Sequence, residues 1–250
     1  MSTRKLDASE GSVSAWLVIA LAIYLVRVMP WAMSELWYDE VITLGDYVFD
    51  IRGRGLGYVF RNYPVANNHM LSSAVYWLWV RFIDFNVTAE HLLRVPSIAF
   101  GALTIVLVMC HWRVWLGSRL AILGGLLLAI SPVFTAYAYQ IRGYALTMAM
   151  AAVAVSGAIE VINGRHRTGQ VIAVAAMLLL PIVIPSNVIL APVLALFIAI
   201  VLWQTGRSWT QCLLRALPAL LAGAVGFSYY FTLWDAFLAV SREPGGWSSA

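Results

Sequence analysis

Two adjacent carboxylates, Asp39 and Glu40, follow Trp37 and Tyr38 just beyond an apolar run. A carboxylate beside aromatic rings at a membrane surface can act as a general base or hold a cation. Neighbouring side chains on a helix point about 100° apart, so we expect only one of the two acids to face a given site. The alternative interpretation is a solvated acidic turn that orients the surrounding loop.

A second polar cluster, Asn67-Asn68-His69, precedes a short apolar helix pattern. Asn68 could cap that helix, since short polar side chains accept hydrogen bonds from the first free backbone N–H groups. His69 could then donate a hydrogen bond to a ligand. Capping without any ligand is the competing interpretation for the asparagines.

Arg142 stands alone in the turn 137–144, between two apolar runs. Positive charge is disfavoured on the external side of a membrane, where we place this turn. An arginine there favours an anionic partner, and its planar guanidinium fits a phosphate. The alternatives are an ion pair with an acid of the first loop or contact with lipid headgroups. Arg94, at the mouth of another run, poses the same choice, and headgroup contact is favoured for it.

The composition requires a lipid environment for the elements that carry these residues. Of the 250 residues 62% are apolar and 11% charged, and the mean hydropathy is +0.81. A soluble domain is nearer half apolar and a quarter charged. The formal charge of +4 reflects loop topology, with no nucleic-acid surface in the pattern. Cys110 and Cys212 lie in or beside apolar stretches and suggest neither a disulfide framework nor a metal cluster.

The apolar runs predict an all-α, polytopic protein with seven spanning helices, since a bilayer core needs ~20 apolar residues per helix. The runs are about 13–32, 95–112, 120–137, 144–162, 171–184, 188–204 and 213–233. With a cytoplasmic N-terminus, six loop arginines between Arg113 and Arg215 fall on the cytoplasmic side, as the positive-inside rule favours. The six arginines are cytoplasmic only if the segment 69–85 does not cross the membrane. We therefore expect it to lie at the outer membrane surface.

The whole chain, 1–250, is predicted to form a single transmembrane domain with one long external loop, 33–93. That loop contains seven of the 12 acidic residues: Glu35, Asp39, Glu40, Asp46, Asp50, Asp84 and Glu90. Long polar loops in a minimal membrane protein are where function tends to lie. The chain is expected to lack a C-terminal part, because residues 244–246 begin what looks like a further external loop.

Four stretches, in order, are similar to motifs of one enzyme superfamily. They are Trp37-Tyr38-Asp39-Glu40; Asn68-His69 before an aromatic-rich helix; Leu93-Arg94-Val95-Pro96-Ser97 with Gly101 and Leu103; and Tyr139-Gln140-Ile141-Arg142-Gly143-Tyr144-Ala145-Leu146. On these motifs the chain resembles the GT-C superfamily of glycosyltransferases over about residues 12 to 160. The resemblance is to the bacterial relatives of dolichyl-phosphate-mannose protein mannosyltransferases and of the aminoarabinose transferases that modify lipid A.

The resemblance implies interfacial helices in the first loop and transfer of a sugar from a polyprenyl-phosphate-linked donor to an acceptor hydroxyl, with inversion. By analogy Asp39 would be the base, Glu40 its orienter or a sugar contact, and Arg142 the partner of the departing phosphate. Supporting contacts to the donor would come from Gln140, Tyr144, His69 and Arg94. The expected partners are this donor, membrane lipid and an unknown acceptor (lipid, glycan or protein), and no nucleic acid. The expected location is a bacterial inner membrane, with the site facing the periplasm.

The chain also departs from the family pattern. Met70 and Leu71 replace two common prolines, and Gln140 stands where many relatives carry a glutamate. The second departure disfavours a divalent metal that bridges two acidic motifs, so no cofactor is assigned. Two other hypotheses stay open. A non-catalytic or incomplete scaffold subunit would be active only with a partner, and a secondary transporter should show inverted repeats and charges near the midplane.

Overall fold

The computed structural model describes residues 10–49, 53, 55–61, 69–83, 87–235 and 238. Every regular element within these ranges is a helix. In this described part of the chain, six helical segments are long and apolar enough to cross a bilayer: Val13–Ala32, His91–Leu116, Gly143–Ile162, His166–Val183, Pro185–Gln204 and Trp209–Leu233. The chain is thus a helical, multi-pass membrane protein, as the composition predicts.

The expected span 120–137 is broken into two helices. Helices α7 (Ser118–Ile130) and α8 (Pro132–Ala138) meet at 67°. Pro132 disfavours helical geometry at the preceding residue, and Ser131 is extended with ψ 120°. The Ser131 hydroxyl then caps α8 by accepting from the Phe134 N–H. The number of spans reaches seven only if this bent pair is counted as one.

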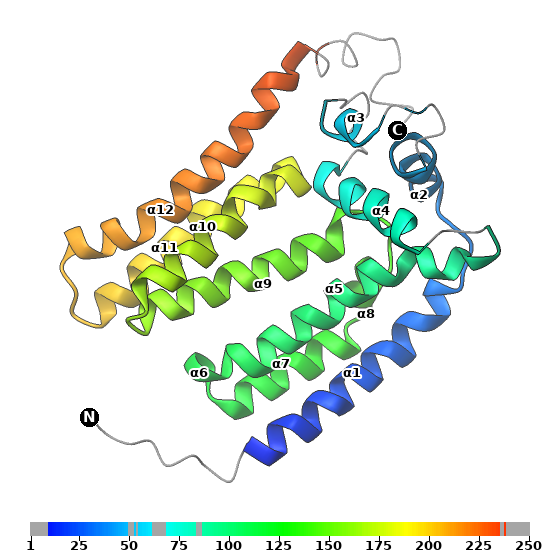
Figure 1. Ribbon diagram of the computed structural model, residues 1–250. Helices are drawn as coiled ribbons and strands as arrows, with labels where there is room; N and C mark the ends of the chain where they lie inside the picture. Colours follow the sequence, from blue (N-terminus) through cyan, green and yellow to red (C-terminus); the bar gives the residue numbers. More distant parts are fainter. Residues whose placement is uncertain are drawn as a thin grey trace.

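The spanning helices form two groups (Figure 1). One group contains α1 (Glu10–Ala32), α5 (Val95–Val106), α7 and α8, with the π-helical turn η3 (Leu107–His111) and the short α6 (Arg113–Leu116). The other contains α9 (Gly143–Ile162), α10 (His166–Val183), α11 (Leu190–Gln204) and α12 (Trp209–Ser228), with the 3-10 turns η4 (Pro185–Ile189) and η5 (Tyr229–Leu233). Helix α9 packs against α5 and joins the groups.

Small residues allow the closest approach between helices in the second group. A Cβ on Gly157 of α9 would lie 2.6 Å from the backbone nitrogen of Ala173 in α10. A Cβ on Gly169 would lie 2.5 Å from the Gly157 carbonyl oxygen. Because both positions lack a side chain, the two backbones pack directly, which is common between membrane helices.

The first long loop forms short helices across one end of the bundle (Figure 1). They are α2 (Tyr38–Thr43), the π-helical η1 (Leu44–Val48), α3 (Leu56–Arg61), α4 (Met70–Phe82) and the 3-10 helix η2 (Val87–Arg94). The 13 residues of α4 extend only about 20 Å at 1.5 Å per residue, too little for a ~30 Å hydrocarbon core. The non-spanning helix predicted for 69–85 is therefore present.

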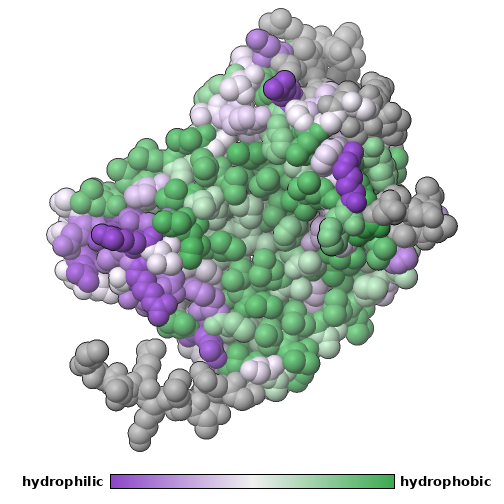
Figure 2. All heavy atoms as spheres, in the orientation of Figure 1, coloured by the Kyte–Doolittle hydropathy of each residue, from purple (hydrophilic) through white to green (hydrophobic). Residues whose placement is uncertain are grey.

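The surface of the bundle is apolar along its flank and polar at its ends (Figure 2). Large aliphatic side chains remain exposed on several spans, among them Val26, Leu127, Val171 and Leu196. Contiguous exposure of this extent is unfavourable in water and is expected for a surface that faces lipid tails.

Candidate functional site at the loop end of the bundle

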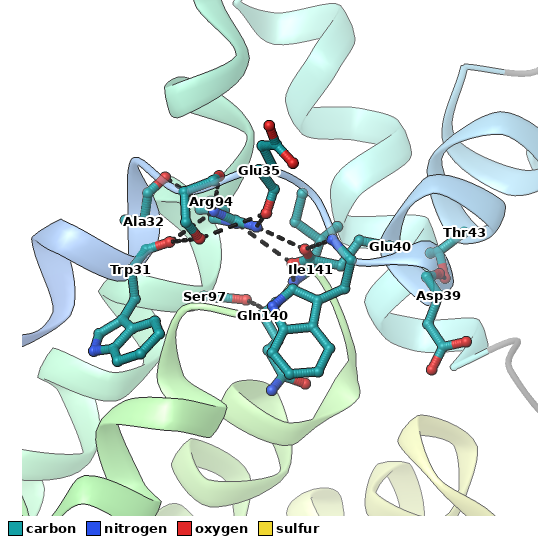
Figure 3. A network of polar contacts seen from close by, with 12 residues as sticks. Trp31, Ala32, Glu35, Asp39, Glu40, Thr43, Arg94, Ser97, Gln140 and Ile141 are labelled. Atoms are coloured by element: carbon teal, nitrogen blue, oxygen red, sulfur yellow. Dashed lines mark hydrogen bonds and ion pairs between the residues drawn. The ribbon is translucent and has the colours of Figure 1, made fainter.

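A buried ion pair between Glu40 and Arg94 organises this end of the molecule (Figure 3). The Arg94 NH2 group lies 2.7 Å from Glu40 Oε2, and the side chains are 1% and 0% exposed. Glu40 also accepts hydrogen bonds from the backbone N–H groups of Trp37, at 2.9 Å, and Ile141, at 2.7 Å. Its carboxylate therefore ties α2 to the turn that precedes α9.

The guanidinium of Arg94 caps the C-terminal end of α1. It donates to four backbone carbonyls at 2.8–3.1 Å: those of Trp31, Ala32, Ser34 and Glu35. The last carbonyls of a helix have no partner within the helix, and the negative end of its dipole favours a cation. Arg94 provides both the hydrogen-bond donors and the positive charge, although it lies 59 to 63 positions from these carbonyls in the chain.

The structure places two of the predicted site residues in this buried network. Glu40 was expected to contact the sugar or orient Asp39, but its oxygens are occupied by Arg94 and two backbone donors. Arg94 was expected at the lipid headgroups or the donor phosphate, but it is enclosed between α1 and α2. The physical reason is the same for both: each buried charge needs a partner, and each provides the other's.

Asp39, by contrast, points away from this network (Figure 3). Its Oδ2 atom accepts from Arg142 NH1 at 2.8 Å, with the two side chains 38% and 17% exposed. As expected from the 100° step between neighbours on a helix, one of the two adjacent acids is buried and the other open. The pairing of Arg142 with an acid of the first loop was one of the alternatives considered above.

The Tyr144 ring lies between Arg142 and two other aromatic side chains, His69 and Tyr137. The Arg142 guanidinium carbon lies 5.2 Å from the centre of the Tyr144 ring, within range of a cation–π contact. The same ring packs against Tyr137, with centroids 4.8 Å apart, and edge-to-face against His69, at 5.4 Å. Tyr137 belongs to the turn named from the sequence but was given no role there; its side chain is exposed.

The His69 imidazole is buried and acts as an acceptor. Its Nδ1 atom receives the Gly143 N–H at 2.6 Å, so the ring proton is assigned to Nε2. Burial, reinforced by Arg142 and opposed by Asp39, lowers the pKa of His69 from 6.5 to about 3. The imidazole is therefore neutral at physiological pH and has one N–H left to donate.

Gln140 forms hydrogen bonds within the protein. Its amide donates to the Ala136 carbonyl at 2.9 Å, and its own backbone carbonyl accepts from the Ser97 hydroxyl. Ser97 is also hydrogen-bonded to the buried Tyr76 hydroxyl. The Tyr76–Ser97 contact links α4 to α5 and has no local sequence signal. At the start of α2, Glu40 accepts from the Trp37 N–H as in one half of a capping box, but Trp37 has no side-chain acceptor for the other half.

Two other expectations concern metal and capping. Within the described residues, no three His, Cys, Asp or Glu side chains lie together in a way that could hold a metal ion. The proposed helix cap at Asn68 lies outside the described residues. The Asp39–Arg142 pair, with its aromatic neighbours, is partly exposed at this end of the bundle. In such an arrangement the arginine can exchange one anionic partner for another.

Comparison with known proteins identifies no relative: no protein-family model, curated protein or solved structure matches this chain.

Proposed function

We propose that this protein is a membrane glycosyltransferase that takes a sugar from a polyprenyl-phosphate-linked donor and transfers it to an acceptor hydroxyl. The reaction takes place at the end of the bundle that carries α2 and α4. In the orientation favoured by the loop arginines, with the bent α7–α8 pair as the seventh span, this end faces the periplasm of a bacterial inner membrane. The observation that carries the proposal is the partly exposed Asp39–Arg142 pair at 2.8 Å.

The site offers the charges that this chemistry needs. Asp39 is an accessible carboxylate for the proton of an acceptor hydroxyl, and Arg142 is a cation for a phosphate. The phosphate of the donor competes with Asp39 for the guanidinium, so that donor binding frees the carboxylate to act as a base. The buried Glu40–Arg94 pair holds α2 and the turn before α9 in fixed relation, which keeps the two reacting groups in register.

In the transfer step Asp39 takes the hydroxyl proton while the acceptor oxygen attacks the anomeric carbon. The bond from that carbon to the phosphate oxygen breaks, and its electron pair leaves with the polyprenyl phosphate. Attack opposite the leaving group inverts the anomeric centre. Arg142 balances the charge that develops on the departing phosphate. This role is worth about 3 kcal/mol when the guanidinium is preorganised. His69 and Tyr144 fix the arginine and the start of α9.

A non-catalytic scaffold is the second candidate, and one observation favours it. Asp39 and Arg142 satisfy each other in this structure, as a purely structural ion pair would. The transporter hypothesis gains no such support, because the charged groups of the site lie at one end of the bundle, on α2 and at the start of α9.

The test is donor consumption by the purified chain in proteoliposomes, with a panel of polyprenyl-phosphate-linked sugars and a mixture of lipid, glycan and peptide acceptors. Release of polyprenyl phosphate by the wild type, and not by empty vesicles, supports the enzyme. Activity only after co-expression with a second membrane protein supports the scaffold. No release from a folded protein across the panel contradicts the proposal.

A further inference from the structure

A second polar region lies at the opposite end of the bundle, over the α9–α10 and α11–α12 turns (Figure 2). Helix α9 begins beside Arg142 and its 20 residues extend about 30 Å. The two ends are therefore separated by the thickness of a bilayer core. Nothing in the proposed sugar transfer uses the groups at this second end.

The charge at this end is strongly unbalanced. The three turns 111–119, 160–170 and 203–215 contain one carboxylate, Glu160, and six arginines: Arg113, Arg119, Arg165, Arg167, Arg207 and Arg215. Glu160 is already engaged by His111 Nε2 and by Arg165, each at 3.3 Å. The sequence of these three turns contains no other acidic residue.

Two of the arginines converge on one pocket. Gln211 and Arg215 lie on the same face of α12, four residues apart, and Arg207, in the turn before α12, lines the same pocket. With His166 and Leu202 they line a small cavity of about 70 Å³. One water molecule needs about 10–15 Å³ of such space, so the pocket has room for a small anion.

The groups that face this pocket all favour a negative charge. His166 interacts electrostatically with both Arg207 and Arg215, and like charges held together are unfavourable without a counter-ion. Among the described residues, its Nδ1 atom is buried without a hydrogen-bond partner. His166 is also the first residue of α10, whose N-cap Arg165 supplies no side-chain cap. The positive end of an 18-residue helix dipole therefore adds to the two guanidinium groups.

We propose that His166, Arg207, Gln211 and Arg215 form a binding site for a phosphate group. The guanidinium groups donate charge-assisted hydrogen bonds to its oxygens. A water bound to the buried His166 Nδ1 completes the set of donors. Both the headgroup of an anionic phospholipid and a free phosphate ion present this chemistry. Trp203 and Trp209 stack at 5.2 Å at the same turn, where paired indoles suit the membrane interface.

The test measures the thermal unfolding midpoint of the purified full chain in detergent micelles. The probes are phosphatidylglycerol, phosphatidylcholine and inorganic phosphate, at constant ionic strength. A ligand that binds only the folded state raises the midpoint with its concentration. We expect phosphatidylglycerol to raise it and phosphatidylcholine to have little effect. If inorganic phosphate also raises it, the oxyanion alone suffices; if it does not, the lipid chains contribute.

The variants locate the effect. Arg207→Gln and Arg215→Gln each remove one charge-assisted hydrogen bond donor and are each expected to weaken phosphatidylglycerol binding about ten-fold, which corresponds to about 1.4 kcal/mol. Gln211→Glu, which adds a carboxylate and removes no arginine, is expected to weaken it as well. Arg119→Gln is the matched control, because Arg119 carries the same charge at the same end and is exposed outside the pocket.

Three results would overturn the proposal. They are no shift with phosphatidylglycerol or phosphate, an equal shift with phosphatidylcholine, or an equal loss of binding in Arg119→Gln and the pocket variants. The last two would show a general effect of lipid or net charge.

Discussion

Asp39 Oδ2 and Arg142 NH1 lie 2.8 Å apart, although 103 residues separate them in the chain. Their neighbours Glu40 and Ile141 are joined in parallel, by a hydrogen bond of 2.7 Å between the buried carboxylate and the backbone N–H. The same two segments are thus held together twice, once inside the protein and once at its surface. The inner contact fixes the geometry, and the outer contact is available for exchange with a ligand.

Arg142→Gln is expected to reduce transfer far more than it reduces stability. Removing a preorganised cation beside a departing phosphate costs about 2.7–4 kcal/mol, or 10²–10³ in kcat. A partly exposed ion pair contributes only about 0–1 kcal/mol to folding. Steady-state kinetics and thermal unfolding of the same preparation measure the two effects. Arg142→Lys should retain part of the activity, because it keeps the charge and loses the planar fork.

Glu40→Gln is expected to lower the free energy of unfolding by about 3–5 kcal/mol, since it leaves the buried Arg94 guanidinium without its counter-charge. Arg94→Met should cost at least as much, because four carbonyls beyond and within the last turn of α1 also lose their donor. Denaturation in mixed micelles measures both. The matched control is Glu35→Gln, whose side chain is exposed in the same loop and should change stability by no more than about 0.5 kcal/mol. Equal effects of Glu40→Gln and Glu35→Gln would contradict the structural role of Glu40.

The sequence was sufficient for the class of fold and for most of the spans. Apolar runs of bilayer length identify spanning helices directly, and the distribution of the loop arginines predicted that the helix at 69–85 does not cross. The 67° break at Ser131 was missed because hydropathy averages over Pro132, although the residue before a proline is biased away from helical geometry.

The candidate site was predicted only in part. The exposed carboxylate and the turn arginine were recognised from their types, and their pairing was one alternative among several. The burial of Glu40 with Arg94 could not be read from local patterns, because it depends on how α1, α2 and α5 meet. A charge that looks suited to a ligand is equally suited to a buried partner, and only the packing distinguishes the two.

The stability of the protein should fall as the pH falls from 7 to 5. Because the folded state lowers the pKa of His69 from 6.5 to about 3, the unfolded chain binds more protons in this range and gains stability relative to the folded one. The expected loss is about 2 kcal/mol. His69→Asn keeps an acceptor for the Gly143 N–H and removes the titrating group, so this part of the pH dependence should disappear. The exposed His91, changed to Asn, is the control and should leave the pH dependence intact.

Gly143→Ala is expected to destabilise the protein by about 1–3 kcal/mol. The new Cβ would lie 2.8 Å from both His69 Nδ1 and Val183 Cγ1, which forces the imidazole or the start of α9 to move. Helix propensity alone would favour the alanine by about 1 kcal/mol. Gly57→Ala, whose Cβ would meet nothing within 4 Å, is the control for the substitution itself. A neutral or stabilising Gly143→Ala would show that the His69 contact is not maintained.

The most direct test of the catalytic account compares donor consumption by wild type, Asp39→Asn and Glu35→Gln in proteoliposomes at equal amounts of folded protein. The account predicts that wild type and Glu35→Gln release polyprenyl phosphate at similar rates. Asp39→Asn should release it about 10²–10⁴-fold more slowly, the usual contribution of a positioned base. A folded Asp39→Asn protein with the full wild-type rate would contradict the assignment of Asp39 as the base.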